Sequence, residues 1–145
     1  MQSVPVKRLS PDAKLPTYGS QDAAGADLYA CLQEPVSVAP GATAWISTGI
    51  ALEVPKGCAG LIYARSGLAC KRGLAPANKV GVVDSDYRGE VVVVLHNHSD
   101  LPQTIQPGER IAQLIITPVL TPAYEEVMEL SSSERGAGGF GSTGS

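Results

Sequence analysis

The sequence predicts an all-β domain, built as a jelly-roll-like barrel or sandwich with one short helix. Short apolar runs rich in Val, Ile and Thr recur between Pro and Gly residues, and almost no segment shows helical periodicity. At 145 residues the chain has the length of one domain. Many short strands without long helices favour this class of architecture.

Strands are expected between turns in which proline presets φ and glycine accepts a positive φ. The turns are at residues 39–41, 54–57 and 106–108, and the strands are at 44–50, 60–64, 90–96 and 110–119. Val91 to Leu95 is apolar without alternation, which is typical of a strand covered on both faces. In so small a domain, the second cover indicates contact with another subunit.

Residues 65–73 give the one helical signal among the strands. Ser66 can cap a helix of one to two turns that Gly73 ends. Its amino end would then present backbone N–H groups and a hydroxyl beside Arg65, which suits an anion. The alternative is an ordinary capped helix on the surface.

Residues 81–89 place Asp84, Asp86 and Tyr87 between glycines, just before the most apolar strand. In extended backbone, the two aspartates share one face and Tyr87 takes the other. A carboxylate there could accept a proton from water or from a sugar hydroxyl, while Tyr87 packs flat against a ribose. The alternative is a hairpin whose aspartates are turn residues.

The carboxyl-terminal segment 135–145 contains five glycines and Phe140, the single phenylalanine of the chain. It is too poor in apolar residues to form a core, so we expect a β domain at 1–130 and a mobile tail at 131–145. Arg135, the aromatic ring and the glycine amides suit a ligand with phosphates and a flat ring. The alternative is an idle tail whose ring packs incidentally.

The formal charge of −3 argues against non-specific binding to nucleic acid or to an anionic membrane. Between Lys56 and Arg88, however, six basic residues face two acidic ones, which fits a small anionic ligand. Cys31, Cys58 and Cys70 lack the spacing of a zinc site or redox pair and indicate a reducing compartment.

Neither a membrane-spanning apolar run nor a signal peptide is found in the sequence. We therefore expect a soluble intracellular protein of the cytoplasm, or also of the nucleus if the source is eukaryotic.

Two further patterns carry less weight. Gly136-x-Gly138-x-x-Gly141 matches the dinucleotide-binding expression, but too few residues follow for the helix that the fold requires. His96 and His98 would face the same way on a strand, yet no third ligand stands at a suitable spacing.

Five segments in order resemble the five motifs of the trimeric dUTPase family. They are residues 24–30, 64–69, 78–89, 108–115 and 135–144, within a match that runs from about Lys7 to the carboxyl terminus. Each segment alone is a weak signal, but five in order are very specific. The departures are mild: Ala64, for example, stands before Arg65 where the family usually has proline.

The resemblance implies a jelly-roll homotrimer whose active sites are each assembled from all three subunits. The implied reaction is hydrolysis of dUTP to dUMP and pyrophosphate, by attack of water on the α-phosphorus. Mg²⁺ is the implied cofactor, held by the substrate phosphates and water without a direct protein ligand. Such an enzyme limits the incorporation of uracil into DNA and supplies dUMP for dTMP synthesis.

The resemblance also implies roles for individual residues. Asp84 orients and deprotonates the water, and Tyr87 lies under the deoxyribose and excludes a 2′-hydroxyl. Asp27 and Asp86 lie behind the residues that touch the substrate, and Asp27 supports the water network around the metal or the tail. The other implied substrate-binding residues are Arg65, Ser66, Gly67, Asn78, Gly81, Val83, Gln113, Arg135, Phe140, Gly141, Ser142 and Thr143. The tail would act as a lid, with Phe140 over uracil and Arg135 near the γ-phosphate.

Two other functions stay open at this point. A dCTP deaminase shares the fold but would need a catalytic glutamate in a differently built pocket. A non-catalytic, nucleotide-dependent regulator would be signalled by loss of Asp84 or Phe140, and both are present.

Overall fold

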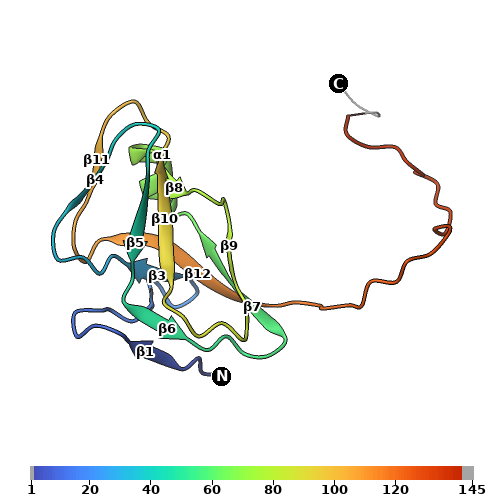
Figure 1. Cartoon of the computed structure of the whole chain (residues 1–145), viewed down its shortest axis with the longest axis horizontal. Helices are drawn as coiled ribbons and strands as arrows, with labels where there is room; N and C mark the ends of the chain where they lie inside the picture. The colour runs from blue at the N-terminus through green and yellow to red at the C-terminus, as the bar shows by residue number, and fades with distance from the viewer. Residues whose placement is uncertain (1, 142–145) are drawn as a thin grey trace.

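The computed structural model describes residues 2–141, which form twelve β-strands and one α-helix (Figure 1). In chain order the elements are β1 (Val6–Arg8), β2 (Thr17–Tyr18), β3 (Ala26–Tyr29), β4 (Val36–Val38), β5 (Thr43–Ser47), β6 (Ile50–Leu52), β7 (Cys58–Tyr63), α1 (Ser66–Arg72), β8 (Leu74–Pro76), β9 (Gly81–Val83), β10 (Val92–Asn97), β11 (Gln103–Ile105) and β12 (Arg110–Pro118). The predicted all-β class with one short helix is confirmed.

The strands pair antiparallel in two main sheets and two ribbons. One sheet has the order β2-β3-β12-β7-β9 and the other β5-β10-β8, while β1 pairs with β6 and β4 with β11. Most strand neighbours are distant in sequence, as expected for a jelly roll. Figure 1 shows β5 and β10 crossing in front of β3 and β12.

The core fills the space between these two sheets. Ile46, Val93 and Leu95 from one sheet join Leu28 and Leu114 from the other in a single buried cluster. Successive side chains of a strand point to opposite faces of the sheet, so in β10 every second residue is buried in this core. Val92 and Val94 on its other face are half-buried in this chain.

The expected strand 44–50 is wrong in one respect, because it divides into β5 and β6 at Thr48 and Gly49. Gly49 has φ of +68°, and a Cβ there would lie 2.8 Å from Cys31 Sγ and 2.9 Å from Ala13 Cβ. The bend is therefore tightly packed. The other three expected strands are confirmed as β7, β10 and β12, with ends that differ by at most two residues.

The proposed cap of the helix is wrong. Arg65 is the N-cap residue, with extended backbone and no side-chain cap, and Ser66 is already the first helical residue. Because the chain enters α1 directly from extended geometry, the Ser66 hydroxyl is not drawn into the helix end and stays exposed. Gly73 does end the helix, at φ 68° and ψ 27°, and its N–H donates to Leu68 O.

After β12 the chain runs out from the β domain in extended form (Figure 1). Residues 119–137 are exposed, including Leu120, Tyr124, Met128 and Leu130. Whether the domain ends at 130 stays a prediction. Across residues 2–141, no helix has the length and apolar character needed to cross a membrane.

Candidate functional site

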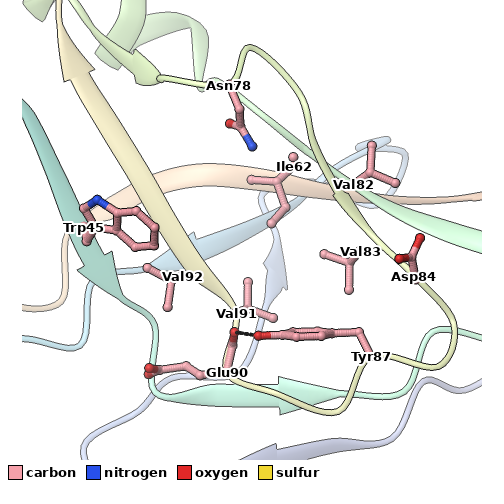
Figure 2. A pocket seen from close by; sticks show the side chains of 11 residues that line it. Trp45, Ile62, Asn78, Val82, Val83, Asp84, Tyr87, Glu90, Val91 and Val92 are labelled. Carbon is pink, nitrogen blue, oxygen red and sulfur yellow. Dashed lines mark hydrogen bonds between the residues drawn. The ribbon is translucent and has the colours of Figure 1, made fainter.

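The candidate site residues of the β domain line two separate pockets. We name the first the Asp84 pocket; it has a volume of about 320 Å³ (Figure 2). Its lining residues are Trp45, Ile62, Asn78, Gly81, Val82, Val83, Asp84, Tyr87, Glu90, Val91 and Val92. The second, the Arg65 pocket, is lined by Gly19, Ala23, Gly25, Asp27, Arg65, Ser66, Gly67, Arg110 and Gln113.

A turn after β9 brings Asp84 and Tyr87 to the same rim of the Asp84 pocket (Figure 2). The Tyr87 N–H donates to Asp84 O at 3.1 Å, so the chain reverses over these residues instead of running extended. The predicted alternation is therefore wrong: Asp84 lines this pocket with Tyr87, and Asp86 lines a different depression beside Glu53 and Arg88.

The Asp84 pocket combines an apolar floor with polar groups at its edges. Ile62, Val83 and Val91 are buried beneath it. Figure 2 shows Asn78 across the pocket from Tyr87, with Asp84 at one side. Apolar walls with a few placed polar groups suit a flat ring that carries hydrogen-bonding edges and a hydroxyl-bearing group.

Asn78 lies in a tight reversal between β8 and β9. Lys79 adopts φ of +66°, and its N–H donates to Pro76 O at 3.1 Å. The next residue, Val80, donates to Asn78 O at 2.7 Å. This turn holds the Asn78 side chain near Gly81, where a Cβ would lie 3.5 Å from Asn78 Nδ2.

The Arg65 pocket is organised by an aspartate shared between two arginines. Asp27 Oδ1 accepts from Arg65 Nε at 3.0 Å, and Asp27 Oδ2 lies 3.5 Å from Arg110 Nη1. The Asp27 side chain is 13% exposed, while Arg110 is half-exposed at the pocket. With two guanidinium groups against one carboxylate, the pocket favours an anion.

Gln113 lies in this pocket because β12 pairs with β3, where Gln113 is opposite Asp27. Its Nε2 donates to Ala64 O at 2.8 Å, just before the helix-capping Arg65. A Cβ at Gly25 would lie 3.1 Å from both Cβ and Cδ of Gln113. The glycine therefore leaves the space that the glutamine side chain occupies.

The structure does not bring the two pockets together within one chain, since they share no lining residue. The tail forms a third group: residues 135–140 line their own shallow depression, Arg135 Nε donates to Gly138 O, and Phe140 is fully exposed. Gly141 has φ of +85°. Ser142 and Thr143 lie outside the described residues.

Among the polar and aromatic side chains that line these pockets, three were not predicted from the sequence. Arg110 lies within the fourth motif-like segment, so its position there was an available signal. Trp45, 76% exposed on β5, gave no comparable signal, because the pairing of β5 with β10 brings it to the Asp84 pocket. Glu90 follows directly after the segment 81–89, but its contacts with Ser47 and Gly49 depend on the fold.

Among residues 2–141, no cluster of three or more His, Cys, Asp or Glu side chains could hold a metal ion. His96 Nδ1 pairs with Thr43 Oγ1 at 3.1 Å, and His98 Nε2 pairs with Ala69 O at 3.1 Å. The two imidazoles thus make separate hydrogen bonds.

The chain is similar in sequence to known proteins. A family model described as dUTPase matches residues 11–144. A deoxyuridine 5′-triphosphate nucleotidohydrolase from an Anaeromyxobacter species is 50% identical over 145 residues, covering 98% of this chain and 97% of the relative.

Solved structures are also similar. The Staphylococcus bacteriophage 80alpha dUTPase with dUPNHPP has a TM-score of 0.90 at 32% identity, with both chains fully covered. A variant dUTPase of phage phi11 of S. aureus, described with a coordinated structural Mg(II) ion, has a TM-score of 0.81 at 27% identity, covering 90% of this chain and 100% of that one.

Proposed function

The chain belongs to the dUTPase family and hydrolyses dUTP to dUMP and pyrophosphate, and from this premise we propose which of its residues carry out the reaction. The observation that carries the assignment of roles is the meeting of Asp84, Tyr87 and Asn78 around one pocket. The reaction lowers the dUTP available for incorporation into DNA and supplies dUMP.

The Asp84 pocket receives the deoxyuridine. Uracil lies over the apolar floor of Ile62 and Val83, and Asn78 with its neighbouring backbone reads the hydrogen-bonding edge of the base. Tyr87 lies beneath the deoxyribose and leaves no room for a 2′-hydroxyl. Gly81, on the same strand β9 as Val83, lies beside Asn78 and leaves space for the base.

Asp84 is the catalytic residue of this proposal. Its exposed carboxylate at the pocket edge accepts a proton from water, whose oxygen attacks the α-phosphorus. The bond from the α-phosphorus to the bridging oxygen breaks, and pyrophosphate leaves. Gln113 lies near the α-phosphate in the assembled site.

The Arg65 pocket receives the phosphates. Arg65, the Ser66 hydroxyl and the Gly67 backbone contact them, with Arg110 adding a second positive charge. The charged groups of this pocket are two arginines and one carboxylate, Asp27, which is already paired with them. Such a lining fits Mg²⁺ that is coordinated by phosphate oxygens and water, without a cage of protein ligands. Mg²⁺ held by those phosphate oxygens would supply charge neutralisation, while Arg65 and Arg110 hold the phosphates in the pocket.

The enzyme acts as a homotrimer with shared sites in this proposal. Within one chain Asp84 and Arg65 line different pockets, so a site that uses both combines pockets from different copies. The open face of β10, with half-buried Val92 and Val94 beside exposed Trp45, supplies apolar surface for such a contact.

The tail closes the site as a lid. Phe140, whose ring is fully exposed, stacks over uracil, and Arg135 approaches the γ-phosphate. Gly141, with Ser142 and Thr143, wraps the triphosphate. Reopening of this segment releases product.

A cytoplasmic location is the finer prediction. It is supported by Cys31, Cys58 and Cys70, which are all free thiols, as expected for a reducing compartment.

The reaction is tested by measuring pyrophosphate release from dUTP, dCTP and dTTP with Mg²⁺. We expect dUTP alone to turn over rapidly, and Asp84→Asn to bind dUTP without hydrolysing it. A folded but inactive parent enzyme, or equal turnover of dCTP and dTTP, would overturn the assignment. Ammonia release from dCTP would favour a deaminase, which needs a catalytic glutamate. Glu90 is the glutamate that lines this pocket, and its carboxylate already accepts hydrogen bonds from the Ser47 hydroxyl and the Gly49 N–H.

Site sharing is tested by mixing two inactive variants, Asp84→Asn and Arg65→Ala, through unfolding and refolding. If Asp84 and Arg65 of one site come from different chains, about one site in four in an equal random mixture regains both residues. Mass analysis of differently tagged chains verifies that mixed trimers have formed. Mixed trimers without recovered activity would place both residues in one chain's site.

A further inference from the structure

Tyr87 is held in the Asp84 pocket by contacts with Gly89 and Glu90, in the turn that leads into the strand β10. Its hydroxyl donates to Glu90 O at 2.8 Å, as Figure 2 shows. Its ring lies over Gly89, where a Cβ would be 2.6 Å from Tyr87 Cζ and 2.9 Å from Cε1, and closer still to the hydroxyl oxygen. The ring therefore occupies the space that any side chain at position 89 would need.

The carbonyl that accepts the tyrosine hydroxyl is itself fixed by the corner between β5 and β6. The Glu90 carboxylate accepts from the Ser47 hydroxyl and from the Gly49 N–H, the latter at 2.9 Å. One residue further on, the Val91 N–H donates to Ile50 O at 2.8 Å, and the buried Thr48 hydroxyl donates to Val91 O. Four hydrogen bonds thus tie residues 90–91 to this corner.

The Tyr87 side chain needs such support because it is 45% exposed. A half-exposed ring has neighbours on one side and water on the other, so packing alone does not define its plane. Rejecting a substrate that differs by one hydroxyl requires a wall that does not yield by the size of an oxygen atom.

We propose that Gly89 and Glu90 are positioning residues that set the plane of the Tyr87 ring, and that they thereby determine selectivity for a sugar without a 2′-hydroxyl. This inference rests on the proposed role of Tyr87 beneath the deoxyribose. Gly89 supplies space for the ring, and Glu90 connects its hydroxyl to the β5–β6 corner. Neither residue needs to touch the substrate.

The test compares kcat/KM for dUTP and for UTP in the full-length enzyme with Mg²⁺. In Gly89→Ala the added carbon displaces the hydroxyl end of the Tyr87 ring. The ratio of kcat/KM for dUTP to kcat/KM for UTP should therefore fall by about 10- to 100-fold. Glu90→Ala should lower the ratio in the same direction. Glu90→Gln should retain most of it, because an amide oxygen can still accept from Ser47 and Gly49.

A second variant keeps the test independent of any folding defect in Gly89→Ala. Tyr87→Phe removes the hydroxyl and keeps the ring, so it should lose part of the selectivity. The double variant Tyr87→Phe/Glu90→Ala should lose no more selectivity than the more affected of the two single variants, because both changes break the same connection between the ring and the β5–β6 corner. Additive losses would contradict that connection.

Ser85→Ala provides the matched control, since Ser85 belongs to the same loop but lines the depression beside Asp86. It should keep the parent ratio. If Gly89 and Glu90 support only the fold, their variants lower the unfolding temperature and leave the ratio unchanged, which overturns the inference. If the parent enzyme does not hydrolyse dUTP, the proposed function itself has failed, so the two failures are distinct.

Discussion

Replacing Asp27 by asparagine should lower kcat without raising KM for dUTP. The substitution keeps the size of the side chain and one oxygen acceptor, but it removes the charge that holds Arg65 and Arg110 at the Arg65 pocket, the proposed phosphate site. Two effects then oppose each other. The arginines lose a fixed partner, while the local formal charge of the three groups rises from +1 to +2.

The magnitude follows from the two contacts. The Arg65 Nε–Asp27 Oδ1 bond is 3.0 Å long, and the side chains are 27% and 13% exposed. A charge-assisted bond of this kind contributes about 1.5–3 kcal/mol, and a neutral acceptor retains roughly half of it. The 3.5 Å contact to half-exposed Arg110 adds at most about 0.5 kcal/mol.

A loss of about 1–1.5 kcal/mol in the positioning of Arg65 corresponds to roughly a tenfold fall in kcat. The added positive charge favours bound triphosphate, so KM should stay equal or fall. The assay is steady-state pyrophosphate release at varied dUTP and saturating Mg²⁺. Asp100→Asn, an identical change at an exposed loop position outside both pockets, is the control and should retain parent kinetics.

An unchanged kcat in Asp27→Asn would refute the idea that Asp27 positions Arg65 for the reaction. A raised KM with parent kcat would show instead that the aspartate contributes to ground-state binding.

Four further changes are expected to act on separate parts of the molecule. Gly25→Ala should lower kcat by about 10- to 100-fold, because the added Cβ displaces Gln113, while the unfolding temperature changes little; activity with parent-like kcat would contradict this placement. Gly49→Ala should lower the free energy of unfolding by about 2–5 kcal/mol in urea titrations, from its φ of +68° and its contacts with Cys31 and Ala13. In Gly57→Ala the backbone has φ of +83° and the added Cβ meets no atom within 4 Å, so the free energy of unfolding should fall only by the cost of the left-handed backbone, about 1–2 kcal/mol. Deletion of residues 135–145 should leave the oligomer intact by light scattering and reduce turnover severely, whereas full turnover would return the tail to the idle interpretation.

The sequence predicted the elements whose signals are local. Proline and glycine marked the turns, and Gly41, Gly57 and Gly108 do have positive φ. It did not predict the break between β5 and β6, because the packing around Gly49 comes from Cys31 and Ala13 in other parts of the chain. The alternation assumed for Asp84 and Asp86 failed since a turn replaces extended backbone there.

The order of the motif-like segments identified most candidate residues, but not their distribution in space. That Asp27 and Gln113 meet follows from the pairing of β3 with β12, which no local pattern encodes. Arg110 and Glu90 were missed for related reasons: each acquires its role through a contact with a distant residue, Asp27 for the first and Ser47 with Gly49 for the second.

The parts of the proposed site differ in how firmly the chain holds them, and this difference matches their tasks. The Tyr87 hydroxyl donates to the carbonyl of Glu90, and four hydrogen bonds fix residues 90–91 to the β5–β6 corner. Discrimination against one hydroxyl requires that the Tyr87 ring be held in place in this way. Residues 119–137 are exposed along their length, which suits a segment that must open after each turnover. Substitutions at the corner should therefore change selectivity more than turnover, whereas shortening the tail should change turnover and leave the choice between dUTP and UTP largely intact.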